Sequence, residues 1–401
     1  MRNILGIGLV VAAVAGLAAR ASAAPASTDD TALVAAIRAD AQAFLDARRV
    51  PEHISAVSVS VNLKGVDHAI DAAVGTARFD GGAAATPASL VQIGSNTKAF
   101  TSVALLQLEA EGKLSIEDPL GKWLPQYPAW KDVTIHQLLD MTSGIPGYDG
   151  EDSVMADYAA HPMTNIPAIA LVAAAYPKRD LNAGWRYTNT AYLLAEMIVE
   201  KASGHSYAAE LKQRFFDNPA LGLHSTYYQA YSYPPAITDR MVSGYFYSTD
   251  SGNAVLKPIY GKDVHTFSVS WMQGAGGIVS TPADVSRWTR ALYEGPLLAD
   301  KQRRELETLV SMANGKPIAV TTLADPRGFG LGVGQATMTG LGTFWFYQGE
   351  TLGYRVLYGW FPKSGAVIVV AANSQPTEKD NMLGKELMPA VYATLKKFGK
   401  L

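Results

Sequence analysis

The chain has 401 residues, and its 34 Lys and Arg against 36 Asp and Glu give a formal charge of −2, which provides no basic face for nucleic acid. Its 48% hydrophobic residues suffice for a large core, and the absence of Cys excludes disulfides, a thiolate nucleophile and cysteine-based metal sites. The length suggests roughly two to three domains.

The first residues predict an export signal. Arg2 is followed by an apolar run over 4–19 and then by Ala21-Ser22-Ala23, which fits a small-residue cleavage site. The run is shorter than the ~20 residues that a membrane-spanning helix needs, so a cleaved signal over 1–23 is favoured over an uncleaved anchor. We therefore expect a secreted or periplasmic protein without a stable membrane span after signal removal.

The next segments predict helices and a first pair of strands. Residues 31–49 have apolar side chains at helical spacing, which is typical of an amphipathic helix. The β-branched alternation over 54–63 predicts a strand, and 68–74 is its expected hairpin partner. Helical spacing returns over 100–111, and Gly112 is placed to end that helix.

The rest of the chain predicts a helical block followed by further strands. Residues 119–235 are expected to be mostly helical, and two more helices are expected over 282–294 and 301–312. The best strand candidates are 329–334, 343–347, 354–361 and 366–373. This order predicts an α+β fold with an α/β sheet domain over 30–100 and 250–401, interrupted by a mainly helical domain over 101–249.

Ser95-Asn96-Thr97-Lys98 is the first motif that can carry chemistry. If Ser95 opens a helix, Lys98 lies one turn later on the same face. A serine hydroxyl is a weak nucleophile without a base, and a lysine is a base when burial lowers its pKa. In the alternative interpretation Ser95 caps the helix and Lys98 is solvated, but the flanking residues are apolar on both sides.

Tyr187-Thr188-Asn189 is the second motif. Tyr187 can pass protons between a serine and a leaving group if neighbouring lysines lower its pKa. Asn189 can donate a hydrogen bond to a substrate carbonyl and hold Lys98. The alternative is an ordinary turn with a tyrosine at an interface.

The third motif, Tyr347-Gln348-Gly349-Glu350, lies at the end of a predicted strand. We expect Gly349 in the turn that follows, where a glycine lets a substrate lie against the strand edge. A plain hairpin turn is the alternative.

These motifs together resemble the serine β-lactamase and penicillin-binding-protein superfamily, nearest its class C β-lactamase, D,D-carboxypeptidase and esterase branch. They occur in the family's order, at spacings of 92 and 160 residues from Ser95 to Tyr187 and on to Tyr347. The resemblance extends from about residue 30 to the C-terminus and includes the stretches 114–124, 133–144, 187–204 and 274–284. It implies an antiparallel sheet flanked by helices with an inserted all-helical domain, as in β-lactamases and transpeptidases.

The resemblance also implies the roles of the motif residues. Ser95 would attack a carbonyl, and Lys98 with Tyr187 would move the protons. Backbone N–H groups of Ser95 and Glu350 would hold the oxyanion, and Asn189 would position the substrate. No metal and no organic cofactor is needed.

One position departs from the family pattern. Tyr347 stands where the family usually has Lys or His to bind a substrate carboxylate, which argues against strong β-lactam recognition. Glu350 adds a negative charge at the expected site. Arg355 can either neutralise Glu350 or bind a substrate carboxylate itself, and the sequence leaves both alternatives open. Tyr148 follows the loop expected beside the site and is a further candidate for substrate contact.

We therefore expect an exported serine hydrolase whose substrates are D-alanyl-D-alanine-type peptides or small esters. A class C-like β-lactamase ranks below these because of Tyr347, and a non-catalytic protein that binds cell-wall fragments is the competing class. The expected partners are a small molecule or a peptide, including peptidoglycan fragments or β-lactams, and not nucleic acid.

Overall fold

The computed structural model describes residues 28–66 and 68–401, so the predicted signal over 1–23 lies outside the described residues. Its largest element is a ten-stranded antiparallel sheet in the order β3-β2-β1-β14-β13-β12-β11-β10-β8-β9. The strands are β1 (Ala56–Asn62), β2 (Ile70–Arg78), β3 (Gly81–Ala84), β8 (Leu309–Ser311), β9 (Pro317–Ile318), β10 (Arg327–Phe329), β11 (Gly334–Met338), β12 (Gly342–Glu350), β13 (Arg355–Phe361) and β14 (Ala366–Ala372).

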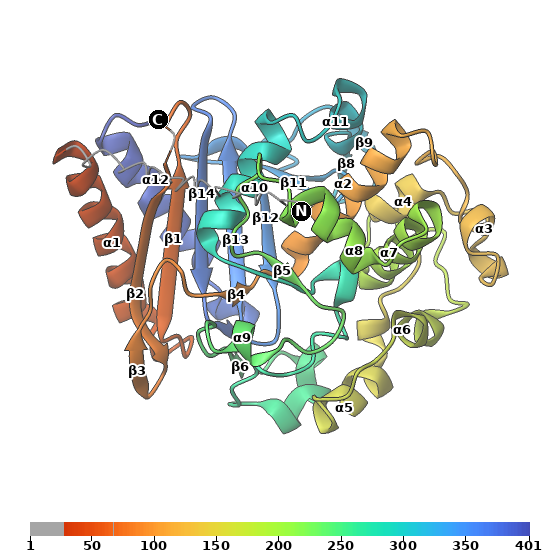
Figure 1. Ribbon diagram of the computed structural model, residues 1–401, viewed down its shortest axis with the longest axis horizontal. Coiled ribbons are helices and arrows are strands. Elements are labelled where there is room, and N and C mark those ends of the chain that lie inside the picture. The colour runs from red at the N-terminus through yellow and green to blue at the C-terminus, as the bar shows by residue number, and fades with distance from the viewer. Residues whose placement is uncertain (1–27, 67) are drawn as a thin grey trace, which may run out of the picture.

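Two small sheets and a set of helices complete the fold (Figure 1). The small sheets contain β4 (Val91–Gln92), β5 (Tyr227–Tyr228) and β7 (Ile278–Ser280), and β6 (Tyr245–Tyr247) with β15 (Ser374–Pro376). The helices are α1 (Thr28–Arg48), α2 (Thr97–Ala110), α3 (Leu120–Trp123), α4 (Ile135–Leu139), α5 (Asp152–Ala160), α6 (Ala168–Ala175), α7 (Asn189–Ser203), α8 (Tyr207–Leu211), α9 (Pro235–Thr238), α10 (Pro282–Glu294), α11 (Asp300–Leu306) and α12 (Met388–Lys397).

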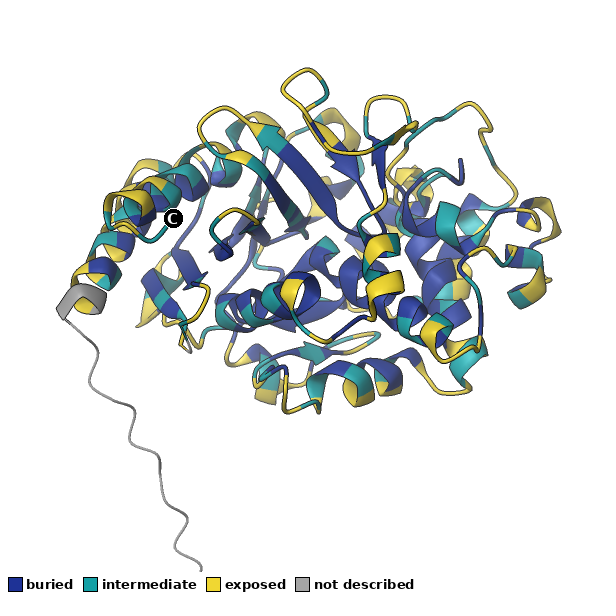
Figure 2. Ribbon diagram, turned by 90° about the horizontal axis from the view of Figure 1, so that it is seen from above, coloured by how far each residue is buried: buried dark blue, intermediate teal, exposed yellow. Residues whose placement is uncertain are grey.

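The central strands are buried on both faces, as Figure 2 shows by their colour. Because successive side chains of a strand point to opposite faces, β14 contributes Val367 and Val369 to one core and Ile368 and Val370 to another. Helices α1 and α12 cover the second face, and α10 packs on the first. The alternation thus places the sheet between two helical layers.

Helix α2 lies in the core of the mainly helical region, which Figure 1 shows beside the sheet. Almost all of its residues are buried, including apolar Phe100, Leu105 and Leu106 on different sides of the helix. A helix that is apolar all round is stable only inside a protein. Helices α7 and α11 and the Gln273–Ala275 turn pack around it.

Most of the predicted elements are present in the structure. Helix α1, the β1–β2 hairpin, α2 and α10 are confirmed, as are β12, β13 and β14 within a few residues. The division into domains at residues 100 and 250 stays a prediction.

Two predicted elements are wrong in part. The helix expected over 301–312 ends at Leu306, because residues 309–311 pair with β10 and β9 in the sheet. The strand expected over 329–334 is broken by a turn in which Gly332 has a φ of +80°. A Cβ atom at Gly332 would lie 2.7 Å from the Ser102 hydroxyl, so this turn closes directly onto α2.

Within residues 28–66 and 68–401, the structure contains no helix that is both long and apolar enough to cross a membrane.

Arg355 at the start of β13 is fully buried and faces buried Glu52 at 2.7 Å. Removing one partner of a buried ion pair leaves the other charge without compensation. We expect Arg355→Met to lower the free energy of unfolding in urea by about 3 kcal/mol. Arg78→Met, which breaks an exposed pair with Asp80, should change it by less than about 0.5 kcal/mol. Equal losses in the two variants would contradict this account.

Candidate active site

Ser95 lies where a short 3₁₀ turn, Gly94–Asn96, runs into α2. The turn is held tightly against strand β12: a Cβ atom on Gly94 would lie 2.5 Å from the Glu350 carbonyl oxygen, and one on Gly349 would lie 1.9 Å from that of Ile93. Only glycine fits at either position. Gly349 therefore lies inside β12, and the prediction that it sits in the following turn is wrong.

Lys98 is completely buried one helical turn after Ser95. Its Nζ lies 3.0 Å from Ser95 Oγ, 2.7 Å from Asn189 Oδ1 and 2.7 Å from the Ala275 carbonyl oxygen. The amide and carbonyl oxygens only accept hydrogen bonds, so they take two amine protons. The lone pair of a neutral amine is then left for the Ser95 proton. This geometry excludes the alternative of a solvated lysine.

The charge state of Lys98 follows from its surroundings. Burial lowers the pKa of Lys98 to about 7, and the negative charge of Asp149 opposes part of that shift. A large fraction of the side chain is therefore a neutral amine at neutral pH. Lys98 thus has both the position and the proton affinity of a general base.

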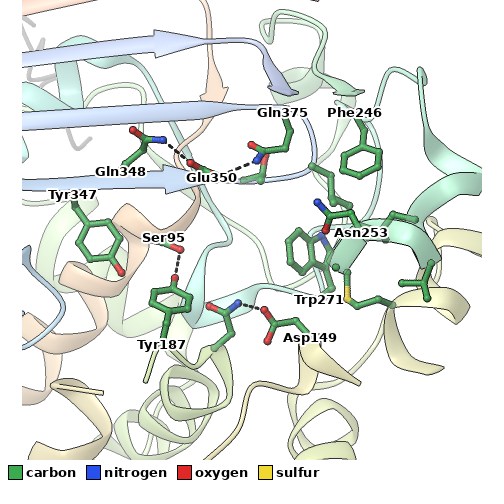
Figure 3. A pocket seen from close by; sticks show the side chains of 17 residues that line it. Ser95, Asp149, Tyr187, Phe246, Asn253, Trp271, Tyr347, Gln348, Glu350 and Gln375 are labelled. Atoms are coloured by element: carbon green, nitrogen blue, oxygen red, sulfur yellow. Dashed lines mark hydrogen bonds between the residues drawn. The ribbon is translucent and has the colours of Figure 1, made fainter. Parts of the chain in front are cut away.

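Tyr187 contacts Ser95 from the open side of the cleft, with its Oη 2.5 Å from Ser95 Oγ (Figure 3). Burial raises the pKa of Tyr187, although the Ser95 and Tyr347 hydroxyls partly oppose the shift. The prediction that lysines lower this pKa is wrong, because desolvation of the phenolate is the largest cause of the shift and raises the pKa. Tyr187 is therefore a neutral phenol that shares a hydrogen bond with the Ser95 hydroxyl, in which either oxygen can be the donor.

Asn189, the first residue of α7, connects Lys98 to a carboxylate. Its Oδ1 accepts from Lys98, and its Nδ2 donates to Asp149 Oδ2 at 2.9 Å. Burial raises the pKa of Asp149, while its own backbone N–H, Asn189 and Lys98 lower it. No motif in the sequence indicates Asp149, because only the fold shows that the segment after Gly144 lies against the start of α7.

Tyr148 does not line the cleft but is buried next to Asp149 and holds the backbone there in place. It is fully buried, its hydroxyl donates to the Trp271 carbonyl oxygen, and its backbone N–H donates to Thr190 Oγ1 at 2.9 Å. These bonds fix the chain immediately before Asp149. The predicted contact between Tyr148 and substrate is therefore corrected to a positioning role.

The end of β12 forms a free edge beside Ser95. Pairing with β11 stops at Phe346, and beyond it Tyr347, Gln348 and Glu350 line the cleft. Thr351 N–H donates to the carbonyl oxygen of Tyr354, the residue before β13. By the alternation of an antiparallel pair, the Glu350 N–H then points the other way, toward the Ser95 turn.

The Glu350 carboxylate is held by three side-chain amides rather than by a cation. Its oxygens accept from Gln348 at 2.5 Å and from Gln375 and Asn381 at 2.8 Å. Arg355 reaches Asn381 but pairs with Glu52 in the core, and it does not line the cleft. The predicted contact between Arg355 and a substrate carboxylate is not supported, because Arg355 lies outside the cleft lining. Arg355 acts on Glu350 only at longer range, through its charge and through Asn381.

The cleft around Ser95 has a volume of about 320 Å³ and two carboxylates as its only charged lining groups among the described residues. It is lined by Ser95, Asp149, Met155, Tyr187, Asn189, Phe246, Gly252, Asn253, Val255, Leu256, Trp271, Tyr347, Gln348, Glu350, Thr351, Leu352 and Gln375. A second hollow of about 170 Å³ shares Tyr187 and Tyr347 and is lined by Trp185, Met312, Arg327, Phe329 and Phe346. Ser95 therefore has an acidic cleft, and beside it a mainly apolar hollow whose one charged lining residue within the described chain is Arg327.

No group of three or more His, Asp or Glu side chains able to hold a metal ion occurs within the described part of the chain.

Comparisons with known proteins place the chain among relatives of β-lactamases and penicillin-binding proteins. A family model described as Beta-lactamase matches residues 41–392. Penicillin-binding protein 4* of Bacillus subtilis (strain 168) is 32% identical over 233 residues, which are 57% of this chain and 51% of that protein. A teichoic acid D-alanine hydrolase of Staphylococcus aureus (strain MRSA252) is 28% identical over 224 residues, 56% of this chain and 51% of that protein. The matched segments thus span about half the length of these relatives.

Solved structures are similar over nearly their whole length. A D-stereospecific amidohydrolase from Streptomyces sp. superposes with a TM-score of 0.71 at 24% identity, covering 87% of this chain and 98% of that one. A D-amino acid amidase from Ochrobactrum anthropi SV3, complexed with D-phenylalanine, gives 0.73 at 23% identity, covering 91% and 99%. These likenesses confirm the predicted α+β fold, a large antiparallel sheet flanked by helices.

The buried position of Lys98 leads to a test of its charge. Only the neutral amine can accept the Ser95 proton, so the rate at which a neutral fluorophosphonate labels Ser95 should rise with pH and level off above about 7. Lys98→Arg, which stays charged, should slow labelling by about 10² or more and remove the rise. The modified peptide is identified by mass spectrometry. A wild-type rate that does not change with pH would contradict the assignment.

Proposed function

The chain belongs to the beta-lactamase family of serine hydrolases, and we propose that it forms an acyl-enzyme at Ser95 with D-alanine-type peptides, amides or small esters. The observation that carries this proposal is the pair of contacts at Ser95 Oγ, 3.0 Å from Lys98 and 2.5 Å from Tyr187. One neighbour can accept the serine proton and the other can donate a proton, and acyl transfer requires both.

Acylation begins when Ser95 Oγ attacks the substrate carbonyl and its proton moves to Lys98. Tyr187 then donates its proton to the departing nitrogen or oxygen, and Lys98 returns a proton to Tyr187. The serine proton has thus passed to the leaving group, the bond to that group has broken, and the acyl group is bound to Ser95.

The negative charge that forms on the carbonyl oxygen needs donors that are already in place. The N–H of Ser95, at the start of a buried helix, and the N–H of Glu350, on the free edge of β12, are suited to this. Gly94 and Gly349 let these two backbone segments approach closely enough to share one oxygen atom. Water then attacks the acyl-enzyme by the reverse proton path and releases the acid.

The nature of the substrate is supported by the named relatives and by the cleft. A teichoic acid D-alanine hydrolase and penicillin-binding proteins are among the similar sequences, and a D-amino acid amidase shares the fold. The second hollow beside Tyr187 is suited to the leaving group, because the proton donor must touch that group. Residues that contact the acyl group are then Asn189 and the walls of the larger cleft.

A class C-like β-lactamase activity is a weaker candidate. Tyr347 is buried and burial raises its pKa, so it is a neutral phenol where the family usually has a cation. A neutral hydroxyl can donate one hydrogen bond but cannot offset the charge of a β-lactam carboxylate. A purely binding role for cell-wall fragments would leave the contacts of Ser95 with Lys98 and Tyr187 without a use.

We also propose export to the periplasm or the medium, on the basis of the signal pattern over 1–23. The partners would then be peptidoglycan fragments, D-alanylated polymers or other small acyl compounds. Comparison of the mass of the protein recovered outside the cytoplasm with that of the full chain tests this proposal.

Substrate class is tested by three assays on the purified protein: a D-Ala-D-Ala peptide, a p-nitrophenyl ester and a chromogenic cephalosporin. We expect turnover of the ester to exceed that of the cephalosporin, because the ester carries no carboxylate and no cation lines the cleft within the described residues. Ser95→Ala should lower turnover by at least about 10³. Unchanged turnover in Ser95→Ala, or no turnover of any substrate, would overturn the proposal.

Tyr187→Phe separates proton donation from the other steps. A p-nitrophenolate departs without a proton, whereas an amide nitrogen must receive one. We therefore expect this variant to lose about 10²–10³ in kcat/KM on a D-alanine anilide but less than about tenfold on the matching p-nitrophenyl ester. Equal losses on the two substrates would assign Tyr187 a different role.

A further inference from the structure

The charged residues that line the cleft are all negative within the described chain, and the acyl-transfer chemistry does not require this. They are Asp149 and Glu350. Lys98 lies beneath the floor, with no exposed surface. A substrate group that enters this cleft therefore meets carboxylates and neutral surfaces only.

The two carboxylates differ in how much of their hydrogen-bonding capacity is already used. Glu350 already accepts hydrogen bonds from three amides, which fix it at the end of β12. Asp149 accepts from Asn189 through Oδ2 and is more exposed to the cleft, so part of its hydrogen-bonding capacity remains open. Because Asp149 lines the cleft with hydrogen-bonding capacity left and Glu350 is already held by three amides, Asp149 is the stronger candidate for contact with a cation.

The position of Asp149 assigns it to the acyl group rather than to the leaving group. Figure 3 shows Tyr347 on one side of Ser95, and Asp149, Trp271 and Phe246 on the other. The leaving group belongs beside Tyr187 and the second hollow, so the acyl group extends toward Asn189 and Asp149. An α-substituent of the acyl group is then brought toward the Asp149 carboxylate.

The remaining wall of the cleft is suited to a hydrocarbon side chain. Beyond Asp149 the lining is apolar and aromatic, consisting of Met155, Phe246, Val255, Leu256, Trp271 and Leu352. Small-molecule sites typically combine such a wall with a few polar groups that fix orientation. Here the charged group that sets orientation is a carboxylate.

We propose that this cleft recognises the free α-ammonium group of an aminoacyl substrate through Asp149, with the substrate side chain against the Phe246 and Trp271 wall. This inference rests on the proposed acyl-transfer function and adds a requirement for an unblocked amine. Substrates whose amine is acylated lose the ion pair, and those that carry a carboxylate on the acyl group meet repulsion from Asp149 and Glu350.

Three p-nitroanilides that differ only at the amine test the inference: D-phenylalanine p-nitroanilide and its N-acetyl and N-succinyl derivatives, measured at pH 7. We expect kcat/KM to fall in the order cationic, neutral, anionic, with at least tenfold between the first and the second. If the acetylated substrate reacts as fast as the free amine, the inference is overturned.

Asp149→Asn removes the charge but keeps an oxygen that can accept from Asn189. We expect the ratio of kcat/KM for the free amine to that for the N-acetyl substrate to fall at least tenfold in this variant. The ratio cancels a change in Lys98 that affects both substrates equally, and substrate binding to Ser95→Ala does not depend on the base. Asp157→Asn on the exposed surface of α5 is the matched control and should leave the ratio unchanged.

A binding measurement removes the dependence on turnover. Ser95→Ala should bind D-phenylalaninamide at least tenfold more tightly than N-acetyl-D-phenylalaninamide by calorimetry, and adding Asp149→Asn should abolish that difference. An unchanged ratio in Asp149→Asn, or no difference in binding, overturns the role of Asp149 while Ser95-dependent turnover leaves the proposed function intact. The absence of Ser95-dependent turnover of any p-nitroanilide or ester would instead overturn the proposed function.

Discussion

Lys98 is a lysine that the fold keeps out of water, and the active site is built around the loss of its charge. An ammonium in this position would have to give up its hydration, and the neutral oxygens of Asn189 and Ala275 replace it only in part. These oxygens come from two different elements, α7 and the turn before β7, so both must converge on α2. The burial that lowers the pKa of Lys98 therefore also requires an apolar helix surrounded by packed elements.

Close backbone approach sets the geometry on the other side of Ser95. Gly94 and Gly349 allow the Ser95 turn to touch the edge of β12, and Gly332 allows the turn between β10 and β11 to touch α2. Any side chain at these three positions would push the sheet away from the helical part. The distance between the nucleophile and the strand edge is thus fixed by the backbone, whose position does not depend on a side-chain rotamer.

The sequence predicts those parts of the molecule that depend on local pattern. Alternation in β1 and helical spacing in α1, α2 and α10 give the main elements, and the motif spacing indicates Ser95, Lys98 and Tyr187. It does not predict features that depend on distant contacts. From the sequence Arg355 has no evident partner, and only the fold places Glu52 beside it. The short strand β8 depends on its pairing with β10. The raised pKa of Tyr187 likewise results from burial, which the motif does not report.

In the proposed mode of recognition, Asp149 would connect substrate binding with the base. Its negative charge raises the pKa of Lys98 above the value that burial alone would give, and so holds part of the lysine in the charged form at neutral pH. An ammonium group paired with Asp149 would offset that charge. The pKa of Lys98 would then fall in the complex, and more of the enzyme would carry the neutral amine when substrate is bound. A substrate with a blocked amine would neither form the ion pair with Asp149 nor lower the pKa of Lys98. Selectivity for a free amine would therefore arise both from tighter binding and from a larger fraction of neutral Lys98.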